Sequence, residues 1–178
     1  MNGAKVKLRA LEPEDVEILY RWENDRSIWH LSTTIVPLSR FALEQYVIGS
    51  GQDLYTARQL RLMIDLLQPI EGLHTIGSVD LFEFEPTHQR AGVGILILKE
   101  FRGKGYASEA LGLLISYAFD TLQLHQLFSN ISPDNPESIR LFESKGFLFI
   151  GTKKDWNRVR NNWQDESMFQ LINHSHKS

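Results

Sequence analysis

The chain reads Arg102-Gly103-Lys104-Gly105-Tyr106-Ala107 between an apolar run, Val93–Leu98, and a helical pattern, Ala107–Leu122. A strand that enters a glycine-rich turn and leaves as a helix directs several free backbone N–H groups at one point. The positive end of the helix dipole lies at the same point. The two glycines allow positive φ and leave a phosphate room to approach the backbone, while the arginine and the lysine add positive charge. This stretch therefore predicts an anion-binding loop.

The composition is that of a folded protein, since 42% of the 178 residues are apolar and 23% are charged. The length predicts one domain over residues 1–178, with a frayed tail at 173–178. A net charge of −3 argues against a nucleic-acid or membrane partner. The absence of cysteine excludes disulfides, thiolate nucleophiles and cysteine-based zinc sites. No apolar run approaches the roughly 20 residues of a membrane span. We therefore expect a soluble cytoplasmic protein that holds no metal.

Hydrophobic periodicity and turn residues predict an α+β fold with a mostly antiparallel sheet. One helix begins at a proline with acidic neighbours and another at the N-cap Ser39. Pro69–Gly72 is expected to form a turn. The expected strands are 6–10, 60–67, 75–85, 89–98, 126–132, 147–152 and 166–172, and the expected helices are 12–23, 39–47, 105–122 and 137–144.

Two motifs resemble those of the GNAT superfamily of acyl-CoA N-acyltransferases. The run from Gly92 through the loop at 102–107 is similar to the signature (Gln/Arg)-x-x-Gly-x-(Gly/Ala), and residues 135–147 are similar to a second motif in which an Asn precedes a helix that ends in Gly-Phe. Residues 8–15 and 162–165 resemble the ribosomal-protein N-terminal acetyltransferase type and the spermidine/diamine type. The resemblance extends from Val6 to Leu171 and implies a GNAT-like mixed sheet with splayed central strands, flanked by helices.

The resemblance also implies a site for acetyl-CoA, used as a co-substrate, in the gap between the splayed strands. It implies direct transfer of the acetyl group to a primary amine, which is a protein N-terminus, an amino acid or a small amine, and it makes a homodimer an expected assembly. Such transfer needs a neutral amine, a donor for the oxyanion and a proton source for the thiolate, but no metal. The residues assigned to the cofactor are Arg102, Gly103, Lys104, Gly105, Tyr106 and Ala107 for the pyrophosphate, Ile95, Leu96 and Ile97 for the pantetheine, and Asn135 and Ser138 beside the thiol end.

The catalytic groups are less conventional, because Phe142 stands where many relatives of this superfamily have a Tyr that protonates the CoA sulfur. We therefore assign the proton donor to Ser138, whose alternative role is a hydroxyl that caps the following helix. Asp80 is the candidate general base. The nearby Glu83 and Glu85 are expected on the opposite face of the strand, where carboxylates usually face water. His30 and His88 could relay protons or lie at the surface. The lack of a Tyr also motivates an alternative function, a catalytically weak acyl-CoA-binding module.

The acceptor side gives a weaker signal. Spermidine-type enzymes carry an acidic cluster after the first helix, whereas residues 32–37 here contain no carboxylate. A polycationic acceptor is therefore disfavoured, since nothing in this stretch would offset its charge. Trp22, Trp29, His30 and Trp156 indicate either an aromatic wall for an amine or peptide end, or core and dimer packing.

Overall fold

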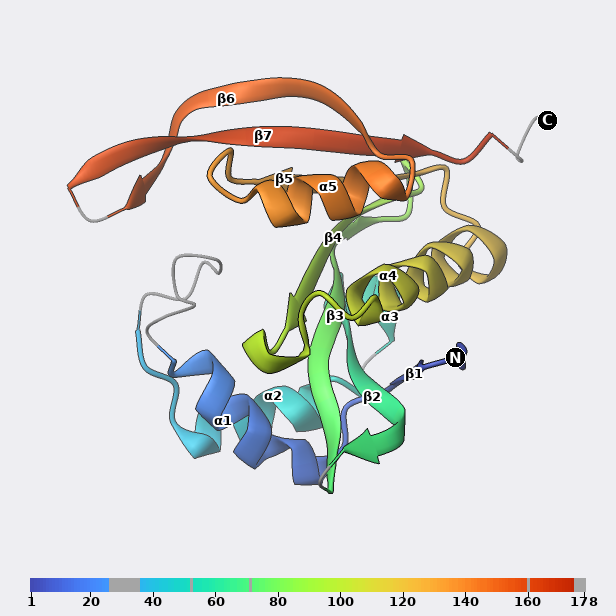
Figure 1. The fold of residues 1–178 in the computed structure, drawn as a ribbon, viewed down its shortest axis with the longest axis vertical. Helices are drawn as coiled ribbons and strands as arrows, with labels where there is room; N and C mark the ends of the chain where they lie inside the picture. The colour runs from blue at the N-terminus through green and yellow to red at the C-terminus, as the bar shows by residue number, and fades with distance from the viewer. Residues whose placement is uncertain (26–35, 52, 71, 160, 175–178) are drawn as a thin grey trace.

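The computed structural model describes residues 1–25, 36–51, 53–70, 72–159 and 161–174. Figure 1 shows a twisted sheet with α1 and α2 packed together at the lower left, α4 at the right and the long β6–β7 hairpin across the top. The elements, in chain order, are β1 (Val6–Arg9), η1 (Pro13–Asp15), α1 (Val16–Glu23), α2 (Arg40–Gly49), α3 (Leu54–Ala57), β2 (Leu60–Ile70), β3 (Leu73–Glu85), β4 (Arg90–Ile97), η3 (Lys99–Phe101), α4 (Tyr106–Ser116), η4 (Tyr117–Thr121), β5 (Gln126–Ile131), α5 (Pro136–Ser144), β6 (Leu148–Val159) and β7 (Asn162–Ile172).

The seven strands form one sheet in the order β1-β2-β3-β4-β5-β7-β6. The central pair, β4 and β5, is parallel, and the other neighbouring strands are antiparallel. The mostly antiparallel α+β sheet expected from the sequence is therefore confirmed. Within the described residues, no helix is long and apolar enough to cross a bilayer.

Alternation along the central strands separates two apolar cores. On β2, Leu62 and Ile64 belong to the cluster that also contains Leu111 of α4 and Phe142 of α5. Met63, between them, belongs to the cluster of α1 and α2. Since successive side chains of a strand point to opposite faces, α1 and α2 cover one face of the sheet and α4 and α5 cover the other.

The two parallel central strands separate shortly after they begin. Pairing between β4 and β5 runs from Arg90 opposite Gln126 to Gly92 opposite Phe128, although both strands continue beyond these residues. Where the backbone pairing stops, the Ser129 hydroxyl donates to the Val93 carbonyl at 3.0 Å. Beyond this bridge the facing edges of the strands are not paired with each other. The expected splay is therefore present.

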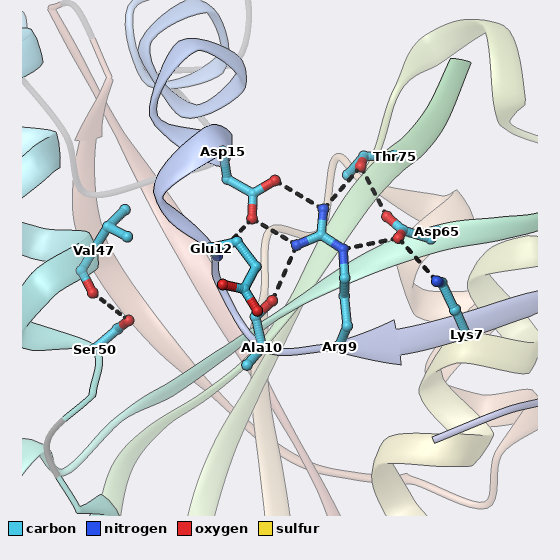
Figure 2. Close-up of polar contacts among 9 residues, drawn as sticks. All are labelled: Lys7, Arg9, Ala10, Glu12, Asp15, Val47, Ser50, Asp65 and Thr75. Atoms are coloured by element: carbon cyan, nitrogen blue, oxygen red, sulfur yellow. Dashed lines mark hydrogen bonds and ion pairs between the residues drawn. The ribbon is translucent and has the colours of Figure 1, made fainter. Parts of the chain in front are cut away.

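A buried network anchors the start of the α1 segment on the sheet (Figure 2). The Arg9 guanidinium donates to both oxygens of Asp15, at 2.6 and 2.8 Å, and through Nε to Asp65 Oδ2 at 2.8 Å. Thr75 on β3 bridges Arg9 and Asp65, and the backbone N–H of Glu12 donates to Asp15 at 2.9 Å. One arginine thus ties β1, β2 and β3 to the turn that begins α1.

The structure differs from the sequence expectation in several places. A single helical turn, α3, follows Asp53, whose side chain caps it by accepting from the backbone N–H groups of Tyr55 and Thr56. One turn is too short to show a periodic pattern.

The expected turn at Pro69–Gly72 is wrong in its first half, because β2 continues to Ile70. The tail begins later than expected, since Asn173 is buried and its backbone N–H donates to the backbone carbonyl of His125 at 2.8 Å. The region 153–165 belongs to the hairpin of β6 and β7 rather than to a loop.

Candidate functional site

The loop at 102–107 has the geometry of an anion site. Gly103 and Gly105 have φ of 73° and 85°, values that only glycine adopts readily. Gly105 is the N-cap of α4, and the first intrahelical hydrogen bond runs from the Glu109 N–H to the Gly105 carbonyl at 3.1 Å. The N–H groups of the preceding first turn therefore have no partner further back in the helix. Arg102 is fixed beside them, because its Nε donates to the Ile97 carbonyl at 2.9 Å.

The edge of β4 that faces the splay is open at the residues assigned to pantetheine. Ile95, Leu96 and Ile97 pair with β3 on the other side of the strand. On the splayed edge, the Val93 carbonyl is taken by Ser129 and the Ile97 carbonyl by Arg102. Because alternate residues of a strand direct their backbone groups to the same side, Ile95 presents its N–H and C=O to this edge. The edge can therefore accept an extended amide chain as an additional pairing partner.

Helix α5 begins beside the open end of β5. The Asn135 side chain is its N-cap and accepts from the backbone N–H of Ser138 at 3.1 Å. The cap is thus Asn135, and the Ser138 hydroxyl makes no hydrogen bond within the part of the chain that the structure describes. Phe142 is 1% exposed and stacks edge to face on Phe147, with ring centroids 4.9 Å apart. Phe142 is therefore a core residue.

Asp80 lies on the opposite face of the sheet, in a cluster with two residues that sequence reasoning missed. Arg61 Nε donates to Asp80 Oδ1 at 2.6 Å, and Arg61 Nη1 donates to Glu23 Oε1 at 2.7 Å. The Tyr46 ring of α2 lies 5.5 Å from the guanidinium carbon. Asp80 is directly opposite Gly94 of β4, next to the point where β4 and β5 separate. The cluster therefore joins the end of α1 to the centre of the sheet.

The protein environment changes the acidity of Asp80. Burial disfavours the charged carboxylate and raises the pKa of Asp80 above its ordinary value, while the charge and the hydrogen bond of Arg61 offset part of this effect. About a quarter of the side chain, 24%, remains exposed. A partly exposed carboxylate with a raised pKa can accept a proton from a bound ammonium group.

The other sequence candidates do not join this cluster. Glu83 lies at a bulge of β3 with φ of 48°, and it is exposed. Glu85 lies 3.5 Å from Arg58, and His88 is exposed in the following turn. Trp156 is 58% exposed on β6, with the Lys153 ammonium 4.8 Å from its ring centre. Trp22 packs against the core of α1 and α2, and Trp29, His30 and residues 32–35 lie outside the described residues.

Arg61 and Glu23 could have been noticed from the sequence only in part. Arg61 interrupts an apolar strand, and a lone arginine in such a strand needs a buried partner. Its partners are 38 residues before it and 19 residues after it, so their identity depends on the register of β2 and β3.

A cavity of about 950 Å³ lies beside α2, at the edge of the sheet. It reaches Tyr46 and Arg61 but does not border the loop at 102–107. Its wall carries the carboxylates of Glu14, Glu17 and Glu44, of which Glu17 is paired with Arg40 at 2.7 Å. It is therefore separate from the anion loop at 102–107.

Comparison with known proteins decides the family. The sequence profile of the acetyltransferase (GNAT) domain matches residues 5–148. The chain belongs to this family. It is an acetyltransferase, and both types of relative that the sequence motifs indicated are confirmed.

Among its relatives is the spermidine N(1)-acetyltransferase of Vibrio cholerae, which is 25% identical over 96% of this chain and 94% of that one. A crystal structure of the Vibrio cholerae enzyme, described as a complex with CoA and spermine, has a TM-score of 0.83 at 25% identity and covers 96% of each chain. A second solved structure of that enzyme, described as dodecameric, has a TM-score of 0.78 at 25% identity and covers 96% of this chain and 95% of that one. The putative ribosomal N-acetyltransferase YdaF of Bacillus subtilis is 31% identical over 54% of this chain and 52% of its own.

Proposed function

We propose that this chain is a single-domain N-acetyltransferase that moves the acetyl group of acetyl-CoA directly onto a primary amine. The observation that carries the proposal is the continuity between the anion loop at the start of α4 and the open edge of β4. The loop suits a pyrophosphate, and the adjoining edge of β4 suits the pantetheine amide chain that is attached to a pyrophosphate in CoA. The structural similarity to a GNAT enzyme described as a complex with CoA supports the same use of the gap.

On the donor side, the chain binds and orients the cofactor. The loop from Arg102 to Ala107 offers backbone N–H groups and a helix dipole to the pyrophosphate. Ile95 and Ile97 of β4 lie on the splayed edge that would pair with the pantetheine amides, with Leu96 between them. Asn135 caps the start of α5 by accepting from the Ser138 backbone N–H, and we assign both residues to the thiol end of the cofactor.

Two side chains move protons in the proposed reaction. Asp80 accepts the proton that the amine must lose before it attacks the thioester, and its raised pKa favours this role. Ser138 donates a proton to the departing thiolate, because Phe142 carries none, and it takes up in exchange the proton that the attacking nitrogen loses as the C–S bond breaks. Arg61 holds Asp80 through one oxygen and is a positioning residue.

The acceptor is a primary amine, and spermidine is the first small amine to test, because the Vibrio cholerae relative is named for it. Residues 32–37 contain no carboxylate, which favours an acceptor of lower charge, such as an amino acid or a peptide N-terminus. The two expectations are separable by the ratio of kcat/KM for spermidine to that for a peptide with a free N-terminus. A self-associated form is part of the proposal, as the dodecameric relative also assembles.

The test measures thiol release from acetyl-CoA with a panel of amines, together with the affinity for CoA by isothermal titration calorimetry. We expect CoA binding and amine-dependent thiol release. Gly105→Asp should reduce CoA affinity by at least about 100-fold, since it adds a carboxylate and strain where the pyrophosphate binds. Gly72→Asp is the control, because Gly72 has a positive φ as Gly105 does and has room for a side chain, but lies in the turn between β2 and β3.

The outcomes separate the competing functions. Binding without turnover for every amine favours the acyl-CoA-binding module. Retained affinity in Gly105→Asp would contradict the assignment of the loop.

A further inference from the structure

The segment before β1 is docked on the first turn of α4. The Glu109 carboxylate of α4 accepts hydrogen bonds from the backbone N–H groups of Ala4 and Lys5, the latter at 3.0 Å. Gly3 lies against the same carboxylate, and a side chain at this position would collide with it. The start of the chain is thus held at the loop that begins α4, although about 100 residues of sequence separate them.

This docking brings the Lys5 side chain to the anion loop. The Lys5 ammonium donates to the Lys104 carbonyl at 3.3 Å. It lies 3.5 Å from the point at which a side chain of Gly105 would begin. The ammonium is therefore beside the N-cap of α4, whose first-turn N–H groups form the proposed pyrophosphate site.

The charges around the loop leave this ammonium well placed for an anion. The Glu109 carboxylate, which lies against this segment, is already bound by two backbone N–H groups. Lys104 turns toward the Phe101 ring, with its ammonium 5.3 Å from the ring centre. Arg102 is tied to the Ile97 carbonyl through Nε. Lys5 therefore adds a positive charge, from the segment that precedes β1, to a site that Arg102 and Lys104 already make basic.

We propose that Lys5 binds the pyrophosphate of CoA. In this proposal, the hydrogen bonds from the backbone N–H groups of Ala4 and Lys5 to Glu109 position the Lys5 side chain for that contact. The inference rests on the proposed use of the loop for acetyl-CoA. It adds a residue from outside the glycine-rich motif, supplied by the segment that leads into β1. The ammonium also bonds the Lys104 carbonyl, so it supports the loop between its two positive-φ glycines.

The experiment compares Lys5→Met with Lys7→Met by calorimetric titration with CoA. Lys7→Met is the matched control, since it also removes one lysine charge near the start of β1. The Lys7 ammonium lies 3.7 Å from Asp65, not at the loop. We expect Lys5→Met to weaken CoA binding about fivefold, which corresponds to about 1 kcal/mol for one charge near the protein surface. Lys5→Arg should recover most of the affinity. The loss should shrink at high salt, because exposed charges are screened.

Two further arms make the inference specific. With 3′-dephospho-CoA, which keeps the pyrophosphate, the effect of Lys5→Met should persist; its disappearance would assign Lys5 to the 3′-phosphate and overturn the proposal. Gly3→Val changes no charge but crowds Glu109, so it should also weaken CoA binding. An unchanged affinity in Lys5→Met, or an equal loss in Lys7→Met, would also overturn it. Wild-type protein that fails to bind CoA would instead contradict the proposed function.

Discussion

Two arginine–carboxylate clusters hold the two ends of the α1 segment. At its start, Arg9 of β1 joins Asp15 to Asp65 of β2. At its end, Arg61 of β2 joins Glu23 to Asp80 of β3. Both arginines thus connect a helical carboxylate with one on the sheet, and both clusters lie on the α1 side of β2.

The clusters differ in what they do to their carboxylates. Burial alone would raise the pKa of Asp15, but the hydrogen bonds from Arg9 and from the Glu12 backbone lower it below its usual value. Burial raises the pKa of Asp80, and Arg61 alone among the neighbours opposes it. The hydrogen bonds around Asp15 therefore favour a fixed anion, whereas burial against a single arginine favours a proton on Asp80.

The largest effect is expected where the proton is exchanged. Asp80→Asn should lower kcat by about 100-fold, the lower end of what a general base contributes, and leave CoA affinity unchanged. In the wild type, kcat/KM should rise with pH as Asp80 loses its proton. This rise should be absent in Asp80→Asn, which has no carboxylate. Steady-state rates measured across pH test both points, and an unchanged acid limb would remove Asp80 from the mechanism.

Ser138→Ala is the companion to this variant, since Ser138 is the proposed proton donor to the leaving group. It should lower kcat, spare CoA binding and keep the rise of kcat/KM on the acid side that we assign to Asp80. An unchanged kcat would show that Ser138 does not donate the proton to the thiolate.

The second effect is on stability and concerns the cluster at the start of α1. Arg9→Met should reduce the free energy of unfolding by about 3 kcal/mol, because it leaves two buried carboxylates without their common partner. Urea unfolding monitored by circular dichroism measures it. Arg61→Met should cost less stability, since Glu23 and Asp80 keep 18% and 24% exposure against 5% and 7% for Asp15 and Asp65. Equal losses would show that the clusters do not differ in this respect.

The sequence predicted the parts of the fold that depend on local pattern. The alternation at Val6, the Ser39 cap and the positive φ of Gly105 all follow from near neighbours, and the structure has them. The β6–β7 hairpin was predicted too short, because residues 153–165 are largely polar on both faces and lack the alternation of a half-buried strand. Ion pairs such as Lys153–Glu166 and Lys154–Asp165 accompany the pairing there instead.

The candidate site follows the same rule: the part formed by neighbouring residues was predicted, and the part assembled from distant residues was not. The loop that we assign to the pyrophosphate is contiguous in sequence, whereas the Asp80 cluster is assembled from α1, β2 and β3. The contact of Arg61 with Asp80 depends on the pairing register, in which the two residues are directly opposite. The docking of Lys5 on α4 depends on Glu109, whose role no local pattern indicates.

The smallest expected effect is on the pH dependence of the free energy of unfolding, to which Asp15 and Asp80 contribute with opposite sign. Asp15 has a pKa below its ordinary value of 3.8, so its contribution to stability is present above that value and is lost as the pH falls through the lowered pKa. Asp80 has a raised pKa, so the folded protein binds its proton more tightly than the unfolded chain does, and stability falls as the pH rises from 3.8 through that pKa. The free energy of unfolding measured at successive pH values should therefore rise less steeply below 3.8 in Asp15→Asn than in the wild type. Above 3.8 it should rise more, or fall less, in Asp80→Asn. A curve parallel to the wild type in either window would contradict the assignment for that carboxylate.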